Sequence, residues 1–394
     1  MTVKALILDL DGTLLASNGT QQTGVPEMIE QLHAAGLKIA IASNRPNAAG
    51  RLNDAGLHAD LIVDRELVGA NKGSPLWVDK PRQIFGVQPN ELLYLGDSEY
   101  DMVSASHARV VYFNAGWVDS DANGPNYGIT LLEPRWFRLI VLECFMKPIN
   151  WYWDLTTTDQ LGRTVLARAL IDGNGAGNQI FKRKLLDFFK YGRGSKVGPM
   201  DFRWFIMLHL LGSIYGEGLY READIWTVYP GNTGKTPAAL NPVLATMAVL
   251  FRDRYVPDLL VRYSDAIDSG ETRAAGGTVD FANQMNTLHL NREHSERIEN
   301  KQILVIDDFE DLGYSMECAR NLLLEGGVAK VLCVSVGKYG YRRYVVAPEG
   351  MHTWDPYDPT HHPNGSFDEL SNRGNYNYDA LTLLRDSFNR LISS

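Results

Sequence analysis

The chain has 394 residues, of which 45% are hydrophobic and 22% are charged, a balance that is typical of globular proteins and excludes a disordered one. This length is enough for roughly two or three domains of ordinary size. The formal net charge of -9 argues against general binding of polyanions, and the three cysteines are scattered without the spacing of metal ligands.

The first predicted element is a buried parallel strand, an apolar run that starts at Ala5 and ends at Asp9 and Asp11. Residues two apart in a strand share a face, so both carboxylates can converge at the carboxyl end, where open α/β sheets bind ligands. Gly12 allows a sharp turn beside them, and Thr13 supplies a hydroxyl. Taken alone, the Asp-Gly dipeptide also fits an ordinary turn at a strand end.

A second predicted strand ends in a hydroxyl. It covers Leu37–Ala42, follows a helical stretch over Pro26–Ala35 and is followed directly by Ser43. Further along, Lys72 precedes a predicted helix with Pro75 at its first position. This part of the chain therefore brings one hydroxyl and one ammonium group to strand or helix ends.

A third predicted strand, Leu92–Leu95, is followed by Asp97 and Asp101. Because the carboxyl ends of parallel strands meet at one edge of a sheet, we expect these acids to lie near Asp9 and Asp11. Each of these motifs alone is weak evidence for a functional site, but their order along the chain is specific evidence for one.

The ordered set resembles the motifs of the haloacid dehalogenase (HAD) superfamily of phosphatases, whose first motif is Asp-x-Asp-Gly-Thr. The resemblance implies that Asp9 is the nucleophile that forms an aspartyl phosphate, and that Asp11 is the general acid and base. It also implies that Ser43 and Lys72 hold the transferring phosphoryl oxygens. Lys80, which precedes a proline, is a rival for the lysine role, but the helix predicted behind Lys72 favours Lys72.

A carboxylate cannot approach a phosphate dianion without a cation between them, so the resemblance also implies Mg²⁺. Its implied ligands are Asp9, the backbone carbonyl of Asp11, Asp97 and Asp101. The two segments in which related proteins insert a cap domain are short here, namely Leu14–Pro26 and Asn44–Lys72. We therefore expect an open site, which suits a large substrate or one covered by another domain.

The segment from 121 to 220 is rich in aromatic residues, several of them at helical spacing, such as Phe181, Leu185 and Phe188. This spacing predicts helices that join two α/β domains. Basic residues between Lys182 and Lys196 leave open the alternative that the segment stacks on the bases of a nucleic acid.

A further strand is predicted over Ala223–Pro230, and a glycine-rich loop follows it. The loop residues are Gly231, Asn232, Thr233, Gly234 and Lys235. The first glycine is too close to the lysine for a nucleotide-binding P-loop, and a plain surface loop is an alternative. The next predicted strand, Asp258–Tyr263, leads into a polar stretch over Ser264–Asn283.

The apolar run that starts at Gln302 ends in the paired acids Asp307 and Asp308. A loop with glycine then leads into a predicted helix over Met316–Leu324, and another strand follows at Ala329–Val336. A strand, loop, helix and strand in this order form a βαβ unit with an anion site at the amino terminus of the helix.

This second motif resembles the phosphoribosyl pyrophosphate (PRPP) motif of type I phosphoribosyltransferases (PRTases). The resemblance implies PRPP binding by Asp307, Asp308, Asp311, Leu312, Gly313, Tyr314 and Ser315, and pyrophosphate binding by the loop from Gly231 to Lys235. Asp311 and Leu312 stand where the family has threonines, and an aspartate facing a phosphate costs Coulomb energy. Either a different group donates hydrogen bonds to the phosphate here, or the transferase reaction has been lost or altered.

We predict an α/β fold with two Rossmann-like parallel-sheet domains, one HAD-like and one PRTase-like, joined by a helical segment. The predicted boundaries are 1–120 for the HAD-like phosphatase domain, 121–220 for the helical segment, 221–345 for the PRTase-like domain and 346–394 for a tail that packs on it.

The predicted function is a Mg²⁺-dependent phosphatase combined with a PRTase-like activity in nucleotide-related metabolism, with a small phosphoester and PRPP as substrates. One alternative is a phosphatase regulated by a PRTase-like domain that only binds PRPP or a nucleotide. A less favoured alternative is a phosphatase that acts on a nucleic-acid end.

No leader precedes the first strand and no apolar stretch reaches membrane-spanning length, so we expect a cytoplasmic protein without membrane contact. The sequence does not indicate the oligomeric state.

Overall fold

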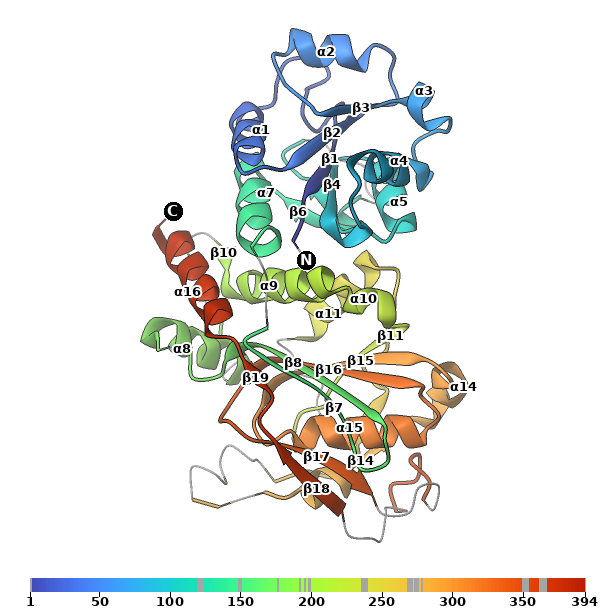
Figure 1. The fold of residues 1–394 in the computed structure, drawn as a ribbon, viewed down its shortest axis with the longest axis vertical. Coiled ribbons are helices and arrows are strands. Elements are labelled where there is room, and N and C mark those ends of the chain that lie inside the picture. The colour runs from blue at the N-terminus through green and yellow to red at the C-terminus, as the bar shows by residue number, and fades with distance from the viewer. Residues whose placement is uncertain are drawn as a thin grey trace. The chain divides into compact units, whose positions relative to one another are not determined.

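The structure of the chain is a computed structural model that forms two compact units (Figure 1). It describes residues 2–118, 124–147, 151–175, 177–190, 193–194, 196–197, 200–234, 240–267, 272, 276–277, 279–348, 354–360 and 367–393. Unit 1 comprises Met1–Ile149, Leu211–Gly218 and Thr246–Arg252, and unit 2 comprises Asn150–Leu210, Leu219–Ala245 and Asp253–Ser394.

Unit 1 is built on a parallel sheet of six strands in the order β3-β2-β1-β4-β5-β6. The strands are β1 (Ala5–Asp9), β2 (Lys38–Ala42), β3 (Leu61–Val63), β4 (Leu92–Gly96), β5 (Tyr112–Ala115) and β6 (Ile129–Leu131). Every residue of β1 is buried, as expected for an unbroken apolar run in the middle of a parallel sheet. The prediction of a parallel α/β sheet at the N-terminus is confirmed.

Helices cover both faces of this sheet. They are α1 (Val25–Ala34), α2 (Ala48–Asp54), α3 (Arg65–Val68), α4 (Leu76–Phe85), η1 (Pro89–Glu91), α5 (Glu99–His107), α6 (Gly124–Tyr127), α7 (Pro134–Ile140) and the π-helical turn η2 (Val141–Phe145). Figure 1 shows α1 and α7 on one side of the sheet and α4 and α5 on the other. The chain leaves β1 toward β2 and leaves β4 toward β5, in opposite directions across the sheet. The carboxyl ends of β1 and β4 therefore flank a topological switch point, where α/β sheets bind ligands.

Unit 2 contains a mixed sheet of seven strands in the order β12-β11-β15-β16-β8-β7-β19. These strands are β7 (Trp153–Thr158), β8 (Thr164–Asp172), β11 (Ile225–Val228), β12 (Arg254–Tyr255), β15 (Gln302–Glu310), β16 (Lys330–Lys338) and β19 (Asn375–Tyr376). Strands β12, β11, β15, β16 and β8 are parallel, whereas β7 is antiparallel to both β8 and β19. The prediction of a second purely parallel sheet is therefore wrong.

The remaining elements of this part of the chain are shorter strands and the helices. The strands are β9 (Lys196–Val197), β10 (Met200–Asp201), β13 (Leu260–Arg262), β14 (Leu288–Leu290), β17 (Arg343–Pro348) and β18 (Phe367–Asn372). The helices are α8 (Gln179–Leu185), η3 (Leu186–Lys190), α9 (Phe202–Glu217), α10 (Leu219–Glu222), α11 (Asn241–Leu250), α13 (Phe281–Met285), η4 (Arg292–His294), α14 (Ser295–Ile298), α15 (Tyr314–Glu325) and α16 (Tyr378–Ser393).

The prediction of a helical segment over 121–220 is wrong for β7 and β8, which form a hairpin in the second sheet. The five residues that join them are too few for the crossover that a parallel pair needs, so the pair is antiparallel. Residues 121–149 belong to unit 1 and residues 150–210 belong to unit 2, which differs from the predicted boundaries. Aromatic spacing suggested helices here, but the nearly continuous burial of β8 is typical of a strand inside a sheet.

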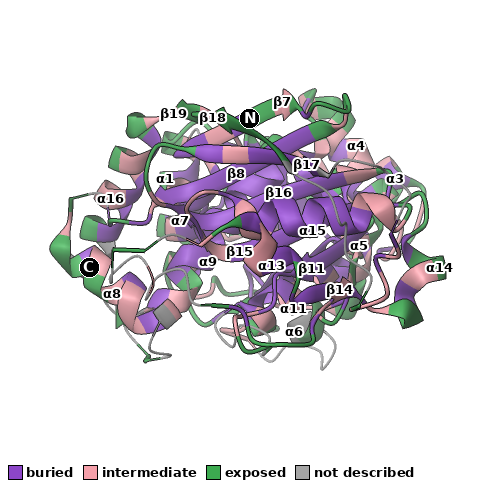
Figure 2. Ribbon diagram, turned by 90° about the horizontal axis from the view of Figure 1, so that it is seen from below, coloured by how far each residue is buried: buried purple, intermediate pink, exposed green. Residues whose placement is uncertain are grey.

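The predicted βαβ arrangement around the paired acids is present, because β15, α15 and β16 follow one another and the two strands are parallel neighbours. Figure 2 shows buried residues along β8, β15, β16 and α15, which form the core of unit 2. One difference matters for the site: β15 does not end at Asp307 and Asp308 but pairs with β16 as far as Glu310.

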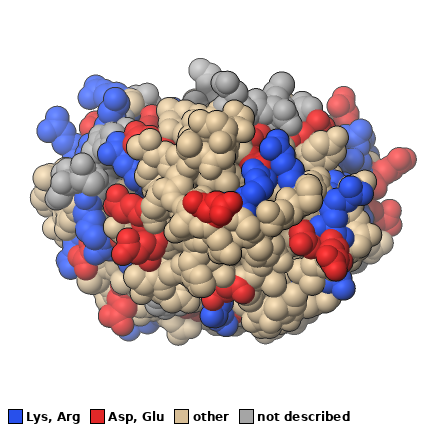
Figure 3. All heavy atoms as spheres, turned by 90° about the horizontal axis from the view of Figure 1, so that it is seen from above, with Lys and Arg blue, Asp and Glu red and all other residues tan. Residues whose placement is uncertain are grey.

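Two further observations concern the surface. On the face drawn in Figure 3, lysine and arginine side chains are interspersed with acidic ones. Along the residues that the structure describes, no helix has both the length and the apolar character needed to cross a membrane.

Candidate active site

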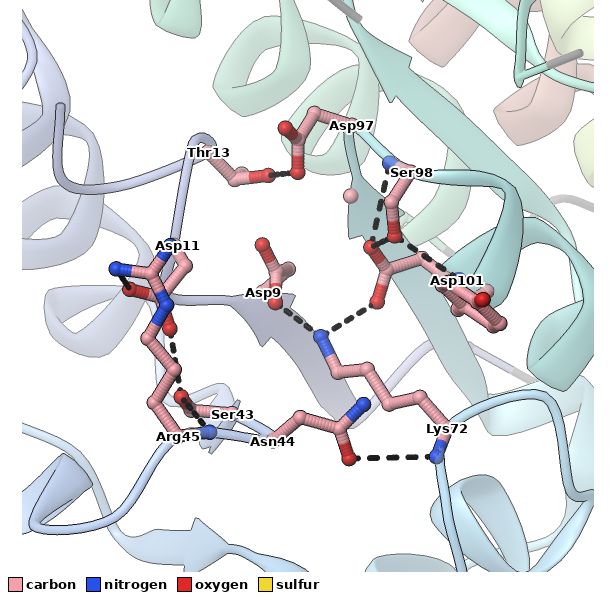
Figure 4. Close-up of polar contacts among 12 residues, drawn as sticks. Asp9, Asp11, Thr13, Ser43, Asn44, Arg45, Lys72, Asp97, Ser98 and Asp101 are labelled. Carbon is pink, nitrogen blue, oxygen red and sulfur yellow. Dashed lines mark hydrogen bonds and ion pairs between the residues drawn. The ribbon is translucent and has the colours of Figure 1, made fainter. Parts of the chain in front are cut away.

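Three aspartates gather at the switch point of unit 1. Asp9 is the last residue of β1, Asp97 directly follows β4, and Asp101 lies in the first turn of α5. One carboxylate oxygen from each lies within 4.8 Å of the other two. Figure 4 shows all three side chains turned toward one another. The structure thus brings together three of the four predicted metal-binding residues through their side chains.

Lys72 provides the positive charge inside this cluster. Its ammonium group is buried, donates a hydrogen bond to Asp9 and lies 2.7 Å from Asp101 Oδ1 (Figure 4). The backbone N–H of Lys72 donates to Asn44 Oδ1 at 3.3 Å, which ties this loop to the end of β2. The rival Lys80 lies within α4, so the structure places Lys72 rather than Lys80 against the carboxylates.

The electrostatics of the cluster favour an additional cation. Burial and the nearby Asp101 charge raise the pKa of Asp9 well above its usual value, although Lys72 acts in the opposite direction. Burial and Asp101 also raise the pKa of Asp97. Burial alone would lower the pKa of Lys72, but Asp101 and Asp9 raise it, so the lysine stays protonated. Three carboxylates share one ammonium group, and oxygen ligands at this spacing fit a hard divalent cation.

Asp101 is oriented by partners that sequence reasoning missed. The buried hydroxyl of Tyr94 donates to Asp101 Oδ1 at 2.7 Å, and the hydroxyl of Ser98 donates to the other carboxylate oxygen. Ser98 is the N-cap of α5 and forms a capping box with Asp101. The sequence pattern of Ser98 followed three residues later by an acid could have predicted this box.

Asp11 points to a different set of partners. Its carboxylate accepts a hydrogen bond from Ser43 Oγ at 2.7 Å and another from the guanidinium group of Arg51, and Arg45 Nη1 lies 3.5 Å away. Burial alone would raise the pKa of Asp11, but the hydrogen bonds from Arg51 and Ser43 lower it. The side chain of Asp11 therefore lies outside the three-carboxylate group, and its predicted metal contact was through the backbone carbonyl. Arg51 was missed, because only folding brings α2 to the end of β1.

The turn after β1 is shaped around Asp97. Gly12 has a φ of +89°, and an added Cβ at this position would collide with the Asp97 carboxylate. Thr13 Oγ1 donates to Asp97 Oδ1 at 3.1 Å. Both residues of the predicted motif therefore act on the same carboxylate, the glycine by its small size and the threonine by its hydroxyl.

No domain is inserted next to this site in either of two connections, Leu14–Pro26 and Asn44–Lys72, and both connections are fully described. Residues 14–26 form a short turn that leads into α1, and residues 44–72 contain only α2, β3 and α3. Within unit 1 the site therefore has no cap domain in these connections, as the sequence predicted.

Unit 2 has a switch point of its own, between β11 and β15. The chain leaves β11 toward β12 and leaves β15 toward β16, in opposite directions. Asp307 is buried at the carboxyl end of β15, and burial together with the adjacent Asp308 raises its pKa well above its usual value. Neighbouring strand residues point to opposite faces, so Asp307 and Asp308 do not share one orientation.

The loop after β15 departs from the predicted phosphate site in several ways. Its residues Asp311 and Leu312 offer no side-chain donor, and the Asp311 carbonyl accepts a hydrogen bond from the buried ammonium group of Lys338. Gly313 has a φ of +85° and caps α15, and the first amides of a helix lack acceptors within that helix. The Tyr314 hydroxyl donates to Glu369 in β18 at 3.1 Å, whereas Ser315 is half-buried in the first turn.

The predicted pyrophosphate loop is partly described. Gly231, Asn232, Thr233 and Gly234 follow β11, and Lys235 lies outside the described residues. Arg262 in β13 donates from Nε to the Gly231 carbonyl at 2.9 Å, and it also contacts Tyr229 and Gln284. This buried arginine anchors the loop through the Gly231 carbonyl, and the sequence analysis did not identify it.

The geometry of unit 1 agrees with comparisons to known proteins. A family profile described as haloacid dehalogenase-like hydrolase matches residues 18–115. Ser43, Lys72, Asp97 and Asp101 lie inside that range, and Asp9 and Asp11 precede it. The chain is also similar to a phosphoglycolate phosphatase from Aquifex aeolicus (strain VF5), with 30% identity over 115 residues, which are 28% of this chain and 54% of that protein. The chain thus spans about half the length of this curated relative.

Similar solved structures include an uncharacterized protein from Listeria monocytogenes serotype 4b, with 17% identity and a TM-score of 0.32, covering 36% of this chain and 97% of that chain. Another is the cobalt-bound form of the deoxy-D-mannose-octulosonate 8-phosphate phosphatase from Haemophilus influenzae, with 21% identity and a TM-score of 0.29, covering 36% of this chain and 88% of that chain.

Proposed function

We propose that unit 1 of this chain, whose N-terminal part is a haloacid dehalogenase-like domain, is a Mg²⁺-dependent phosphatase of small phosphomonoesters. The observation that carries the proposal is the buried Asp9, which shares one ammonium group with Asp101 at the edge of a three-carboxylate cluster. Such a cluster costs free energy unless a cation or a reaction intermediate offsets its charge. The similarity to a curated phosphatase supports the same reaction class.

In this proposal Asp9 is the nucleophile. Its carboxylate oxygen attacks phosphorus, an aspartyl phosphate forms, and the bond from phosphorus to the ester oxygen breaks. The leaving oxygen takes a proton from Asp11, which lies two residues beyond the nucleophile at the same strand end. Asp11 then accepts a proton from the water that hydrolyses the aspartyl phosphate. The hydrogen bonds from Arg51 and Ser43 lower the pKa of Asp11, which favours its role as a base in this second step. For the first step Asp11 has to take up a proton beforehand, and a monoprotonated phosphoester supplies one as it binds.

Lys72 and Ser43 would bind the transferring phosphoryl oxygens, because their ammonium and hydroxyl groups stand on either side of Asp9 (Figure 4). The residues that fit Mg²⁺ are Asp9, Asp97 and Asp101, with the backbone carbonyl of Asp11 as a further oxygen ligand. A bound Mg²⁺ would offset the charge between carboxylate and phosphate. Gly12 and Thr13 keep Asp97 in place for this role.

The test is an Asp9→Asn variant assayed for hydrolysis of p-nitrophenyl phosphate with Mg²⁺. We expect kcat to fall by at least about a thousandfold, because a carboxamide is a poor nucleophile. Asp79→Asn, which changes a partly exposed aspartate of α4, is the matched control and should keep its activity. Circular dichroism checks that both variants are folded. Activity of Asp9→Asn equal to that of the control would refute the proposed nucleophile.

We also propose that unit 2 binds PRPP, and one specific observation favours this second role. The paired acids Asp307 and Asp308 lie in the last part of β15, the loop from Gly231 to Gly234 comes shortly after β11, and these two strands flank the switch point of the sheet. Carboxylates there can bind vicinal hydroxyls, and the first amides of the twelve-residue helix α15 can bind a phosphate. The comparisons add no support to this role, which rests on topology and on these residues.

Two outcomes of PRPP binding are open to this chain. A transferase would make a ribose 5-phosphate ester, which a phosphatase can hydrolyse, so ribosylation and dephosphorylation would be coupled. A binding module would sense PRPP or a nucleotide and regulate unit 1, which suits a loop in which Asp311 and Leu312 supply no donor.

Calorimetry with PRPP and Mg²⁺ tests the binding of PRPP, which both alternatives require. We expect saturable binding by the full chain and at least about tenfold weaker binding by an Asp307→Asn, Asp308→Asn double variant, because charged hydrogen bonds to the ribose hydroxyls are lost. Release of pyrophosphate in the presence of nucleobases then separates a transferase from a sensor. If the double variant bound PRPP as tightly as wild type, the proposed PRPP site would be refuted.

A further inference from the structure

Two arginines meet at Asp11 from different elements. Arg45 follows β2 by three residues, and Arg51 lies in α2. The guanidinium group of Arg51 donates through Nη2 to Asp11 Oδ1, and Arg45 Nη1 lies 3.5 Å from the same oxygen. The backbone N–H of Arg45 donates to Ser43 Oγ at 3.2 Å, which places the start of this side chain beside the site (Figure 4).

The single carboxylate of Asp11 does not balance this pair. Two guanidinium groups contact this one carboxylate, and the charge of Asp9 acts on Arg51 only through space. The Arg45 side chain is 62% exposed and that of Arg51 is 25% exposed, so the pair borders solvent. Arg51 Nη1 is shielded from solvent and has no hydrogen-bond partner within the described part of the chain. The pair therefore keeps donors that Asp11 does not use.

The position of the pair relates it to one end of the substrate. In the proposed mechanism the general acid Asp11 contacts the ester oxygen of the leaving group, so Arg45 and Arg51, which both reach Asp11, lie within reach of the leaving group. Ser43 also bonds to Asp11 and is the group assigned to the transferring phosphoryl oxygens. Neither of the two connections described above inserts a cap domain that could select the leaving group. Selection within unit 1 then depends on side chains such as these arginines.

We propose that Arg45 and Arg51 bind an oxyanion of the leaving group, so that the site prefers phosphomonoesters whose leaving group carries a carboxylate or a second phosphate close to the ester oxygen. This inference rests on the proposed phosphatase function and deepens it by naming the substrate class. A planar guanidinium group presents paired N–H donors that match the two oxygens of a carboxylate or phosphate.

The test compares esters that differ in charge but hardly in size. The first pair is phosphoglycolate and its neutral amide, phosphoglycolamide, and phosphate release by the full chain is measured with Mg²⁺. We expect kcat/KM to be about tenfold or more higher for the acid, the effect of one charge-assisted hydrogen bond. In Arg45→Gln and Arg51→Gln this ratio should fall toward one, chiefly through KM. Because the readout is the ratio of kcat/KM for the acid to kcat/KM for the amide, an effect of the substitutions on Asp11 that is common to both esters cancels.

Two control variants sharpen the result. Lys38→Gln removes an exposed positive charge at the opposite end of β2 and should keep the wild-type ratio. Arg51→Lys keeps the charge but loses the paired donors, so it should keep part of the preference. A second pair, ethylene glycol bisphosphate and 2-hydroxyethyl phosphate, determines whether the preferred oxyanion is a phosphate or a carboxylate.

The outcomes separate this inference from the phosphatase function. Hydrolysis of p-nitrophenyl phosphate without a preference for either charged ester overturns the inference alone, as does a preference that both glutamine variants retain. Absence of phosphate release from every substrate overturns the phosphatase function and this inference together.

Discussion

At the scale of single residues, Lys72 is a buried lysine held between two carboxylates of unit 1. Its side chain is 6% exposed and its ammonium group contacts two carboxylates, Asp9 and Asp101, that are buried themselves. An isolated buried carboxylate is costly, so the stability of this edge of the sheet depends on the balance between these charges. The same balance predisposes the cluster to take up a divalent cation.

Replacing Lys72 with methionine should therefore destabilise the protein even before catalysis is considered. We expect Lys72→Met to lower the free energy of unfolding by about 3–5 kcal/mol in EDTA, because it leaves buried carboxylates without their cation. Added Mg²⁺ should restore part of this loss, since a divalent cation replaces the missing charge. Urea unfolding with and without Mg²⁺ measures both effects.

Lys80→Met is the matched control for this measurement, because Lys80 is a half-buried lysine of α4 outside the carboxylate cluster. Lys80→Met should change the free energy of unfolding by no more than about 1 kcal/mol. Equal stability of Lys72→Met and wild type in EDTA would contradict the view that Lys72 neutralises the cluster.

At the scale of elements, the turn after β1 couples backbone conformation to the position of a carboxylate. Gly12 and Gly19 both have positive φ angles, +89° and +83°, so alanine strains the backbone at either position. Only Gly12 is packed against Asp97, because an added Cβ at Gly19 meets nothing within 4 Å. The two glycines therefore separate backbone strain from displacement of the carboxylate.

Gly12→Ala should weaken Mg²⁺ binding and activity, whereas Gly19→Ala should lose only stability. We expect both variants to lose about 1 kcal/mol or more from the left-handed conformation. For Gly12→Ala alone, the Mg²⁺ affinity followed by thermal shift should fall by at least about tenfold, because Asp97 moves away from Asp9 and Asp101. Unchanged Mg²⁺ affinity in Gly12→Ala would argue against Asp97 as a ligand.

A second element-scale feature is the buried ionic network that ties α15 to β17 in unit 2. Glu317 in α15 accepts from Arg320 at 2.7 Å and lies 2.9 Å from Arg343 in β17, and Arg320 reaches Asp159 at 3.0 Å. Burial alone would raise the pKa of Glu317, but Arg343 and Arg320 lower it. In the same way, hydrogen bonds from Arg163 and the charge of Arg320 lower the pKa of Asp159 against the effect of burial.

Stability measurements on Glu317→Gln across a range of pH should show how much the ionised Glu317 carboxylate contributes to the free energy of unfolding. An acid with a lowered pKa in the folded state stabilises the protein above its unfolded pKa, about 4.3 for glutamate, and loses this effect as the pH falls through its folded pKa. The variant should therefore be less stable than wild type by about 3–5 kcal/mol at neutral pH. The difference should shrink as the pH falls below about 4. Urea unfolding across this range measures it.

Glu296→Gln, at an exposed position of α14, serves as the control and should show a small difference at every pH. A difference between Glu317→Gln and wild type that stays constant from neutral to acid pH would mean that the ionised carboxylate is not the source of the stability.

At the scale of the whole molecule, the two proposed sites are each built within one unit. Asp9, Lys72, Asp97 and Asp101 belong to unit 1, whereas Asp307, Asp308, the loop from Gly231 to Gly234 and Arg262 belong to unit 2. No residue of either set is shared. Ligand effects should therefore be local unless a conformational change in one unit biases the other.

Hydrogen exchange with the two ligands tests this independence. We expect Mg²⁺ to slow amide exchange around β1, β4 and α5, and PRPP to slow it around β11, β15 and α15, because binding stabilises the segments that form each site. Asp97→Asn should abolish only the first effect, and the Asp307→Asn, Asp308→Asn double variant only the second. Protection of β1 or α5 by PRPP would contradict independence and favour regulation of the phosphatase by unit 2.

The sequence by itself determined much of unit 1 and its site. Apolar runs that end in Asp9, Ser43 and Asp97 predicted buried strands, and parallel strands deliver their carboxyl ends to one edge of a sheet. The sheet is parallel as predicted, and Asp9, Asp97 and Asp101 do gather there. These features depend on local patterns and on one general rule of α/β topology, so they could be predicted without coordinates.

Only the tertiary structure decided the rest. The contact of Arg51 with Asp11 joins residues forty positions apart, and the network around Glu317 joins α15 to β17 and to the hairpin loop at Asp159. The antiparallel hairpin of β7 and β8 also became part of the second sheet although its aromatic residues suggested helices. Such pairings depend on how separate elements pack, and an apolar pattern specifies that a face is buried without specifying its partner.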